Sequence, residues 1–259
     1  MPIRVPDYLA ARERGDLETE DRFFSNLRLR DHVFKLTYRH RFDDTLAATA
    51  RLVRSGRVLD LGCSSGVAAV ELAAALPACE VFGSDRMIRA TYLERDRRGW
   101  LLDDRDRVIQ VDGRDWAMSW FPSKRDIVFR PLRVARSFGL RLELHRGTFR
   151  RSLISLVSST VAASGVTICE EDALRPQLAG TFQLIRVANF WNRLYFTTEE
   201  LRALRDATIS RLTEGGVLFV VRTHDDRSNH GTFFERRGGR LHEIERVGQG
   251  SDVTSVLVE

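Results

Sequence analysis

The sequence predicts an α/β fold with a parallel sheet, because strand and helix signals alternate and a glycine turn joins the first pair. Residues 57–61 form a short strand that holds Val58, Leu59 and Leu61, residues 67–76 form an alanine-rich helix that ends before Pro77, and residues 80–85 form a second strand. A strand, a turn, a helix and a second strand make a βαβ unit, whose crossover is right-handed.

Composition excludes several classes of protein. The chain has 259 residues, 43% of them hydrophobic and 30% charged, which is enough to bury a sizeable core and too apolar for general disorder. Three cysteines, at 63, 79 and 169, lie far apart without a C-x-x-C motif. We therefore expect no disulfide scaffold, no metal site and a cytoplasmic location. The longest apolar-leaning segment, residues 152–163, is too short for a membrane span.

The charge pattern does not favour a nucleic-acid-binding protein, although it leaves that partner open. The net charge is +5, and all but two of the 41 basic residues are arginine. Arginine suits carboxylate and phosphate binding. However, the 36 acidic residues are interspersed with the basic ones, and no block of like charges forms an interaction tail.

The glycine turn after the first strand has the chemistry of a nucleoside site. Gly62 and Gly66 lack a Cβ, so the backbone can adopt positive φ and approach a ligand closely. The helix behind them presents unpaired N–H groups and a partial positive charge. Asp85 ends the second strand, where a carboxylate can bind both hydroxyls of a ribose.

The segment Val58-Leu-Asp-Leu-Gly-Cys-Ser-Ser-Gly66 resembles the first motif of class I S-adenosylmethionine-dependent methyltransferases. The resemblance implies a Rossmann-like seven-stranded sheet with helices on both faces and S-adenosyl-L-methionine as cofactor. In that family, the acid at the Asp60 position binds the methionine end together with the neighbouring backbone, and the acid at the Asp85 position binds the ribose. The cofactor-binding residues that it implies around these strands are Asp60, Gly62, Cys63, Ser64, Gly66, Asp85 and Arg86.

Later segments extend the resemblance over about half of the chain. They are a third strand at 166–174, a fourth at 182–189, a helix at 198–212 capped by Thr197 or Thr198, a fifth strand at 213–221, and a hairpin of 232–235 with 240–246. The resemblance implies that Glu171, Asp172, Ala173 and Asn189 also contact the cofactor. An alternative third strand, 108–113, would make Asp112 the acid beside the adenine and would make 126–129 the fourth strand. We favour the later pair, because it runs directly into the helix and the Gly-Gly strand.

The segment between the second and third strands is long, so we expect an insertion. Residues 1–55 form a helical N-terminal cap, residues 56–259 form the methyltransferase domain, and residues of about 96–160 form a β-rich and helical insertion. Trp100-Leu-Leu102 and residues 108–111 flank a polar turn and predict a β-hairpin. This segment holds Trp100, Trp116, Trp120, Phe121, Arg130, Arg133, Arg136, Arg141, Arg146, Arg150 and Arg151, either as a substrate lid or as a satellite core with a solvated arginine face.

Candidate catalytic groups follow the fourth and fifth strands. Asn189 and Tyr195 lie where such enzymes place substrate-facing polar groups, and His224, next to two aspartates, could act as a general base. More often such a trio of residues is a surface turn. Tyr38 and His40 could close over the cofactor, although packing or solvent exposure also fits them.

The sequence therefore favours an S-adenosylmethionine-dependent methyltransferase whose acceptor, reached by in-line methyl transfer, is a small molecule. Two alternatives remain: a cofactor-binding protein with this fold and without turnover, and an RNA or protein methyltransferase that uses the arginine-rich insertion. Nothing in the sequence indicates the oligomeric state or identifies the acceptor atom.

Overall fold

The computed structural model describes residues 2–29, 35, 38–120 and 148–259, which form two compact units. One unit comprises residues 37–88 and 157–259, and the other comprises residues 1–36 and 89–156. The cap at 1–55 and the insertion at 96–160 stay predictions of the domain organisation. Among the residues named above for these segments, 121, 126–129, 130, 133, 136, 141 and 146 lie outside the described residues.

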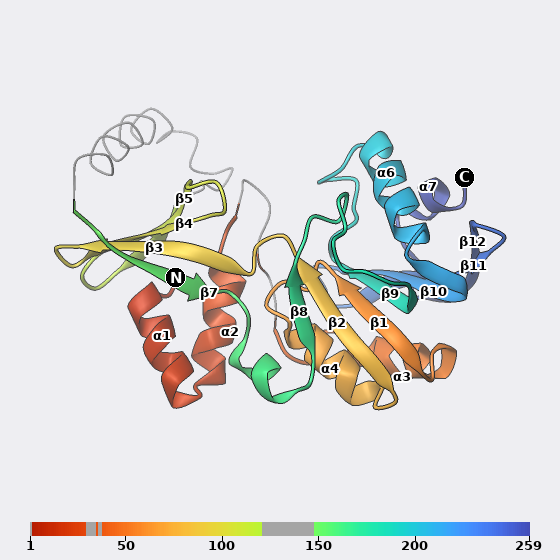
Figure 1. Cartoon of the computed structure of the whole chain (residues 1–259), viewed down its shortest axis with the longest axis horizontal. Coiled ribbons are helices and arrows are strands. Elements are labelled where there is room, and N and C mark those ends of the chain that lie inside the picture. The colour runs from red at the N-terminus through yellow and green to blue at the C-terminus, as the bar shows by residue number, and fades with distance from the viewer. Residues whose placement is uncertain (1, 30–34, 36–37, 121–147) are drawn as a thin grey trace. The chain divides into compact units, whose positions relative to one another are not determined.

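The larger unit alternates strands and helices, as the sequence predicts (Figure 1). Its elements are α3 (Asp43–Leu52), β1 (Gly56–Leu61), α4 (Val67–Ala75), β2 (Cys79–Asp85), a 3-10 turn (Ser159–Ala163), β8 (Thr167–Glu170), β9 (Phe182–Ala188), α6 (Thr198–Ile209), β10 (Leu212–Thr223), β11 (Asn229–Arg237), β12 (Arg240–Val247) and α7 (Thr254–Leu257). Across the described segments of both units, no helix has the length and apolar character that crossing a bilayer requires.

Seven strands form one mixed sheet in the order β12-β11-β10-β9-β1-β2-β8. The first five strands along the chain pair in parallel, and β11 and β12 add an antiparallel hairpin at one edge. The sheet therefore has the expected α/β, Rossmann-like arrangement. The later choice of third strand is confirmed, because β8 pairs with β2, whereas residues 108–112 belong to a different sheet.

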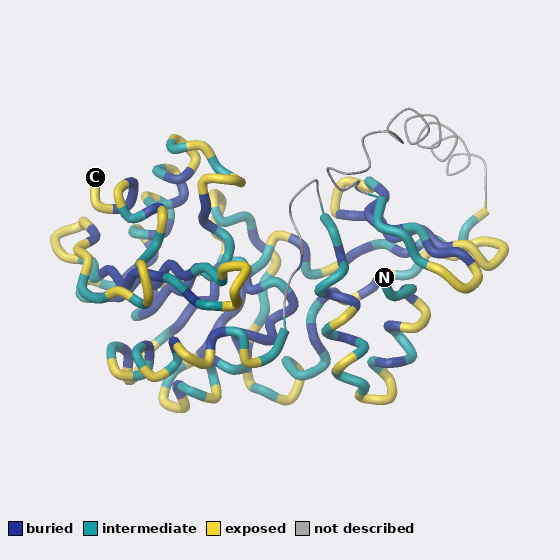
Figure 2. Tube along the Cα trace, turned by 180° about the vertical axis from the view of Figure 1, so that it is seen from behind, coloured by how far each residue is buried: buried dark blue, intermediate teal, exposed yellow. Residues whose placement is uncertain are grey.

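Helices cover both faces of this sheet, because successive strand residues point to opposite sides. In β1, Val58 joins the core under α3 and α4, whereas Leu59 joins the core under α6 and α7. In β9, Leu184 and Ile185 divide between the two cores in the same way. Figure 2 shows the buried positions concentrated along these central strands.

The smaller unit is an antiparallel sheet accompanied by two helices. Its elements are α1 (Val5–Arg14), α2 (Leu17–Asn26), β3 (Arg89–Arg95), β4 (Arg98–Leu102), β5 (Val108–Asp112), β6 (Ala117–Ser119) and β7 (Arg150–Ser155). The strand order is β6-β5-β4-β3-β7, and the predicted hairpin of residues 100–102 with 108–111 is confirmed by the pairing of β4 with β5.

The tryptophans of the smaller unit divide between packing and exposure. Trp100 is 3% exposed and packs with Leu102 and Val108, with Trp120 partly buried against them. Trp116 is 53% exposed. The satellite core expected from the sequence therefore exists, and Trp116 stands outside it.

The first turn of α6 offers a test of the local fold. The Thr197 hydroxyl accepts the N–H of Glu200, and the Glu200 carboxylate accepts the N–H of Thr197 in return. We expect Thr197→Ala to lower the free energy of unfolding by about 1 kcal/mol. Urea unfolding measures the loss, and Thr198→Ala, one residue further along, should cost less than half as much. Equal losses would contradict the capping role.

Candidate functional site

The glycine turn between β1 and α4 adopts the backbone geometry that its sequence requires. Gly62 and Gly66 have φ of 80° and 83°, and Ser64, which has a Cβ, also has a positive φ of 58°. The N–H groups of Gly62 and Cys63 both donate to the carbonyl of Ser84, at 2.8 and 2.9 Å. The turn is thus fastened to the end of β2, and the first turn of α4 begins directly behind it.

Asp85 lies at the carboxyl end of β2 and connects this strand to the turn. One carboxylate oxygen accepts the N–H of Ser64, and the other accepts the N–H of Met87, both at 2.9 Å. Asp85 is only partly buried. Its carboxylate is therefore oriented by two backbone bonds and still reachable from solvent.

Asp60, in contrast, faces the protein interior. It is 1% exposed, and its Oδ1 accepts the Nε–H of Arg186 at 2.9 Å. Arg186, also 1% exposed, donates in addition to the carbonyl of Ala68 in α4. The guanidinium lies 5.4 Å from the ring centroid of Phe42. Asp60 as a direct cofactor ligand stays a prediction, because this carboxylate is already part of a buried ion pair.

An aromatic ring covers the first glycine of the turn, and no local sequence pattern predicts this contact. A Cβ placed on Gly62 would lie 3.2 Å from Cγ of Phe190. Phe190 follows β9 and packs edge to face against Phe196, with the ring centroids 5.3 Å apart. Any ligand seated in the turn would therefore meet the Phe190 ring or displace it.

Asn189 belongs to a polar network at the carboxyl ends of β9 and β10. Its Oδ1 accepts the N–H of Thr223 at 2.8 Å, and its φ is 56°. The Thr223 hydroxyl donates to Asn229 at 2.7 Å and accepts the Nε–H of Arg41 at 3.0 Å. The Asn229 amide in turn donates to Asp44 at 2.7 Å. The segment before α3 is therefore held against the sheet edge where a ligand is expected.

The predicted adenine-side residues follow β8, beside β2. Burial alone would raise the pKa of Glu171, but hydrogen bonds from the backbone of Leu178 and Gln177 and from Arg211 hold it below its usual range. Glu171 therefore orders its own loop. Asp172 is half-buried, and Ala173 packs against the core.

The alternative adenine-side acid lies in the smaller unit. Asp112 ends β5, is 3% exposed and accepts bonds from Val5, Tyr92 and Gln110. Burial raises the pKa of this carboxyl, more than its hydrogen bonds lower it. Asp112 therefore organises the smaller unit, and Asp172 alone follows a strand paired with β2.

The remaining predicted residues are exposed. His224 lies in the turn between β10 and β11, and its ring stands 4.4 Å from that of His230. Its neighbour Asp226 accepts bonds from Ser228. Tyr195 is 39% exposed, and Arg86 is also exposed. Catalytic roles for Asn189, Tyr195 and His224 stay predictions.

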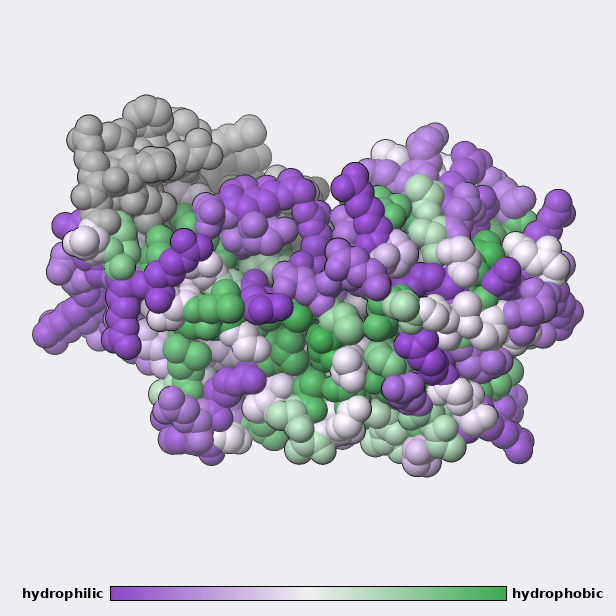
Figure 3. Space-filling view, viewed as in Figure 1, coloured by the Kyte–Doolittle hydropathy of each residue, from purple (hydrophilic) through white to green (hydrophobic). Residues whose placement is uncertain are grey.

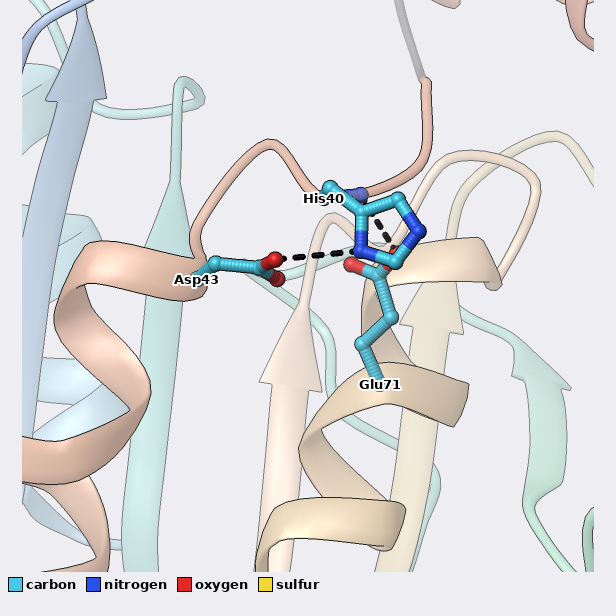
Figure 4. Close-up of side chains that lie close together, drawn as sticks. All are labelled: His40, Asp43 and Glu71. Carbon is cyan, nitrogen blue, oxygen red and sulfur yellow. Dashed lines mark hydrogen bonds and ion pairs between the residues drawn. The ribbon is translucent and has the colours of Figure 1, made fainter.

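His40 lies close to two carboxylates, those of Asp43 and of Glu71 in α4 (Figure 4). The ring atom Nδ1 of His40 lies 3.0 Å from the Asp43 carboxylate, and the backbone N–H of His40 donates to the Glu71 carboxylate at 2.6 Å. Burial raises the pKa of Glu71. The three ligand-type atoms lie within 4.8 Å of one another, so the group has the donors to hold a cation as well as to orient a histidine. The expectation that the chain binds no metal is untested.

Comparisons with known proteins point to methyltransferases of low similarity. No protein-family model matches the chain, and no curated protein sequence matches it either. Similar solved structures include the N-methyltransferase NodS from Bradyrhizobium japonicum WM9 with S-adenosyl-L-homocysteine (16% identity, 85% of this chain and 74% of that one, TM-score 0.37). Two others are the methyltransferase SibL (19%, 71% and 37%, 0.38) and human N-acetylserotonin methyltransferase with SAM (13%, 87% and 44%, 0.40).

This chain thus spans little more than a third of the SibL chain. Because all of these scores are low, the fold assignment depends on the strand order given above.

The buried ion pair under the turn makes a testable prediction. We expect Arg186→Met to lower the free energy of unfolding by about 3–5 kcal/mol, because it leaves the Asp60 carboxylate buried without its partner. Urea unfolding measures this loss. The same substitution at Arg202, whose ion pair with Glu259 is exposed, should cost less than about 1 kcal/mol. A similar loss in both variants would contradict the role given to the buried pair.

Proposed function

We propose that the chain binds S-adenosyl-L-methionine at the carboxyl edge of the seven-stranded sheet and transfers its methyl group to a small molecule. One observation carries this proposal: the Asp85 carboxylate is bonded to the glycine turn through the Ser64 N–H. This bond joins the acid that we propose binds the ribose to the glycine turn. Both lie at the edge of the parallel strands where open α/β sheets bind ligands.

Asp85 has the capacity to bind a ribose. An ionised carboxylate offers about four lone-pair sites. Two of them are used by Ser64 and Met87, one on each oxygen. These two backbone bonds, one to each oxygen, hold the carboxylate in a fixed orientation, in which we propose that it accepts the ribose hydroxyls.

The opposite end of the cofactor carries a carboxylate, which the start of α4 suits. The N–H groups of Gly62 and Cys63 are already bonded to Ser84. We therefore assign binding of the cofactor carboxylate to the first turn of the nine-residue helix α4, where backbone N–H groups and the helix dipole favour an anion. On the adenine side, Asp172 and Ala173 follow β8, which places them beside β2.

The acceptor would lie among the groups that follow β9. The cofactor supplies an electrophilic methyl group, and the protein supplies alignment and exclusion of water. Phe190 and Phe196 provide an apolar wall, and Asn189 and Tyr195 provide polar groups on the same segment. This combination of an apolar surface with few polar groups is typical of small-molecule sites.

Where the acceptor must lose a proton, we assign that role to His40 in preference to His224. Asp43 binds His40 Nδ1, so Nε2 would be the basic nitrogen, as in other histidines oriented by a carboxylate. The acceptor atom would form its bond to the methyl carbon, the S–CH3 bonding pair would remain on sulfur, and the acceptor proton would pass to His40 Nε2.

Cofactor binding is tested by changing Asp85. We expect Asp85→Asn to weaken S-adenosylmethionine binding at least tenfold in titration calorimetry, because hydrogen bonds to an ionised acceptor are roughly twice as strong as neutral ones. Asparagine keeps one acceptor oxygen for the turn. Glu80→Gln, at the opposite end of the same strand, removes equal charge and should leave the affinity unchanged. Failure of the unaltered protein to bind the cofactor would overturn the proposal.

Turnover is tested with the two histidines. With a metabolite extract as the acceptor source, His40→Asn should lower S-adenosylhomocysteine production about 100-fold or more, the usual range for loss of a general base. Cofactor affinity should stay unchanged in His40→Asn, and His224→Asn should retain activity. Cofactor binding without any product would favour the alternative of a binding protein. Loss of S-adenosylhomocysteine production in His224→Asn, with production kept in His40→Asn, would assign the role of the base to His224 instead.

A further inference from the structure

The smaller unit contains a cavity of its own, of about 390 Å³. Four arginines line it, together with the side chains of Tyr92 and Glu94: they are Arg4, Arg97, Arg98 and Arg114. All of these residues belong to the smaller unit, so the cavity needs no other part of the chain. Its volume lies within the range of small-molecule sites.

Two of these arginines have no carboxylate partner in the part of the chain that the structure describes. Arg97 and Arg98 are exposed, and within the described ranges of the chain neither forms an ion pair. Arg4, by comparison, binds Asp7 at 2.6 Å, and Arg114 lies 3.9 Å from Asp115 with both side chains more than 70% exposed. The cavity therefore carries positive charge that no carboxylate of the described chain neutralises.

A tight turn of the backbone brings Arg97 and Arg98 to the same end of the hairpin. Arg95 and Arg98 are paired across β3 and β4, so Asp96 and Arg97 form a two-residue turn. Both turn residues have positive φ, 50° and 64°, which is the geometry of a tight hairpin. Figure 1 shows this turn at the left end of the smaller sheet, where hydrophilic side chains gather on the visible face in Figure 3.

The walls of the cavity are fixed by a buried carboxylate. Asp112 accepts the N–H of Val5 at 2.8 Å and the hydroxyl of Tyr92 at 3.1 Å, which ties the start of α1 to the sheet. Tyr92 also lies over Gly99, where a Cβ would come within 1.8 Å of its hydroxyl oxygen. The arginines therefore surround an aromatic floor that is already in place without a ligand.

We propose that this cavity binds the phosphate group of a small molecule. Arg97 and Arg98 each bring a guanidinium group without a carboxylate partner among the described residues, and two such groups can pair with a dianionic phosphate. Guanidinium also binds phosphate oxygens in bidentate fashion. The start of α1, with Arg4 as its N-cap, adds a partial positive charge. A concave site of this size admits a phosphorylated small molecule rather than a single ion.

The test uses the full chain and titration calorimetry with ribose 5-phosphate, inorganic phosphate and acetate. Ribose 5-phosphate should bind most tightly and acetate should not bind. Arg97→Gln/Arg98→Gln should weaken ribose 5-phosphate binding at least tenfold, because two charge-assisted contacts are removed. Glu94→Gln removes the only carboxylate that lines the described cavity and should strengthen binding several-fold, a gain that misfolding cannot produce.

A control in the same hairpin separates the cavity from general charge attraction. Arg95→Gln also removes one positive charge, but Arg95 does not line the cavity. This variant should therefore bind ribose 5-phosphate as tightly as the unaltered protein does. Absence of saturable binding, equal binding of acetate, or equal loss in Arg95→Gln would overturn the proposal. The Asp85→Asn variant should keep its phosphate affinity, so failure of this inference and failure of the methyltransferase proposal are distinguishable.

Discussion

The ion pair between Asp60 and Arg186 is the constraint on which the rest of the candidate site depends. The two residues are direct partners in the register of β1 and β9, and both are almost wholly buried. Neither charge could be buried alone without a penalty of several kcal/mol. Because Arg186 also binds the carbonyl of Ala68, the pair connects two strands to the first turn of α4. The glycine turn, which lies between β1 and α4, is thereby held in place from both ends.

This arrangement divides the acids of the site into two kinds. Asp60 and Glu171 are buried, and each forms an ion pair with a buried arginine, so they shape the backbone around the site. Asp85 is partly exposed, and each of its two oxygens accepts a backbone N–H. In the proposed site a ligand is therefore recognised through Asp85 and the backbone, whereas a direct contact of the cofactor with Asp60 stays a prediction.

The positions of the strands of the larger sheet along the chain were predictable, because each strand has its own apolar pattern and its own turn signal. The partners of buried charges were not. Arg186 interrupts an apolar strand, and only the register of β1 with β9 shows that it meets Asp60. Phe190 reaches Gly62 from a distant segment, which no local pattern encodes. Asp112 looked like a strand-end acid of the main sheet, but hydrogen bonding to Val5 assigns it to the smaller unit.

The abundance of arginine has no single explanation in this molecule. Arg186 and Arg211 are buried and satisfy acids, and a planar guanidinium suits that task because it donates several fixed hydrogen bonds. Arg97 and Arg98 are exposed beside a cavity and satisfy nothing within the described chain. The amino-acid composition does not distinguish these four arginines. Their burial and their ion pairs do: of the four, Arg97 and Arg98 have no carboxylate partner in the described chain and can bind a ligand. Arginine content alone therefore could not decide between structure and binding, whereas the position of each guanidinium does.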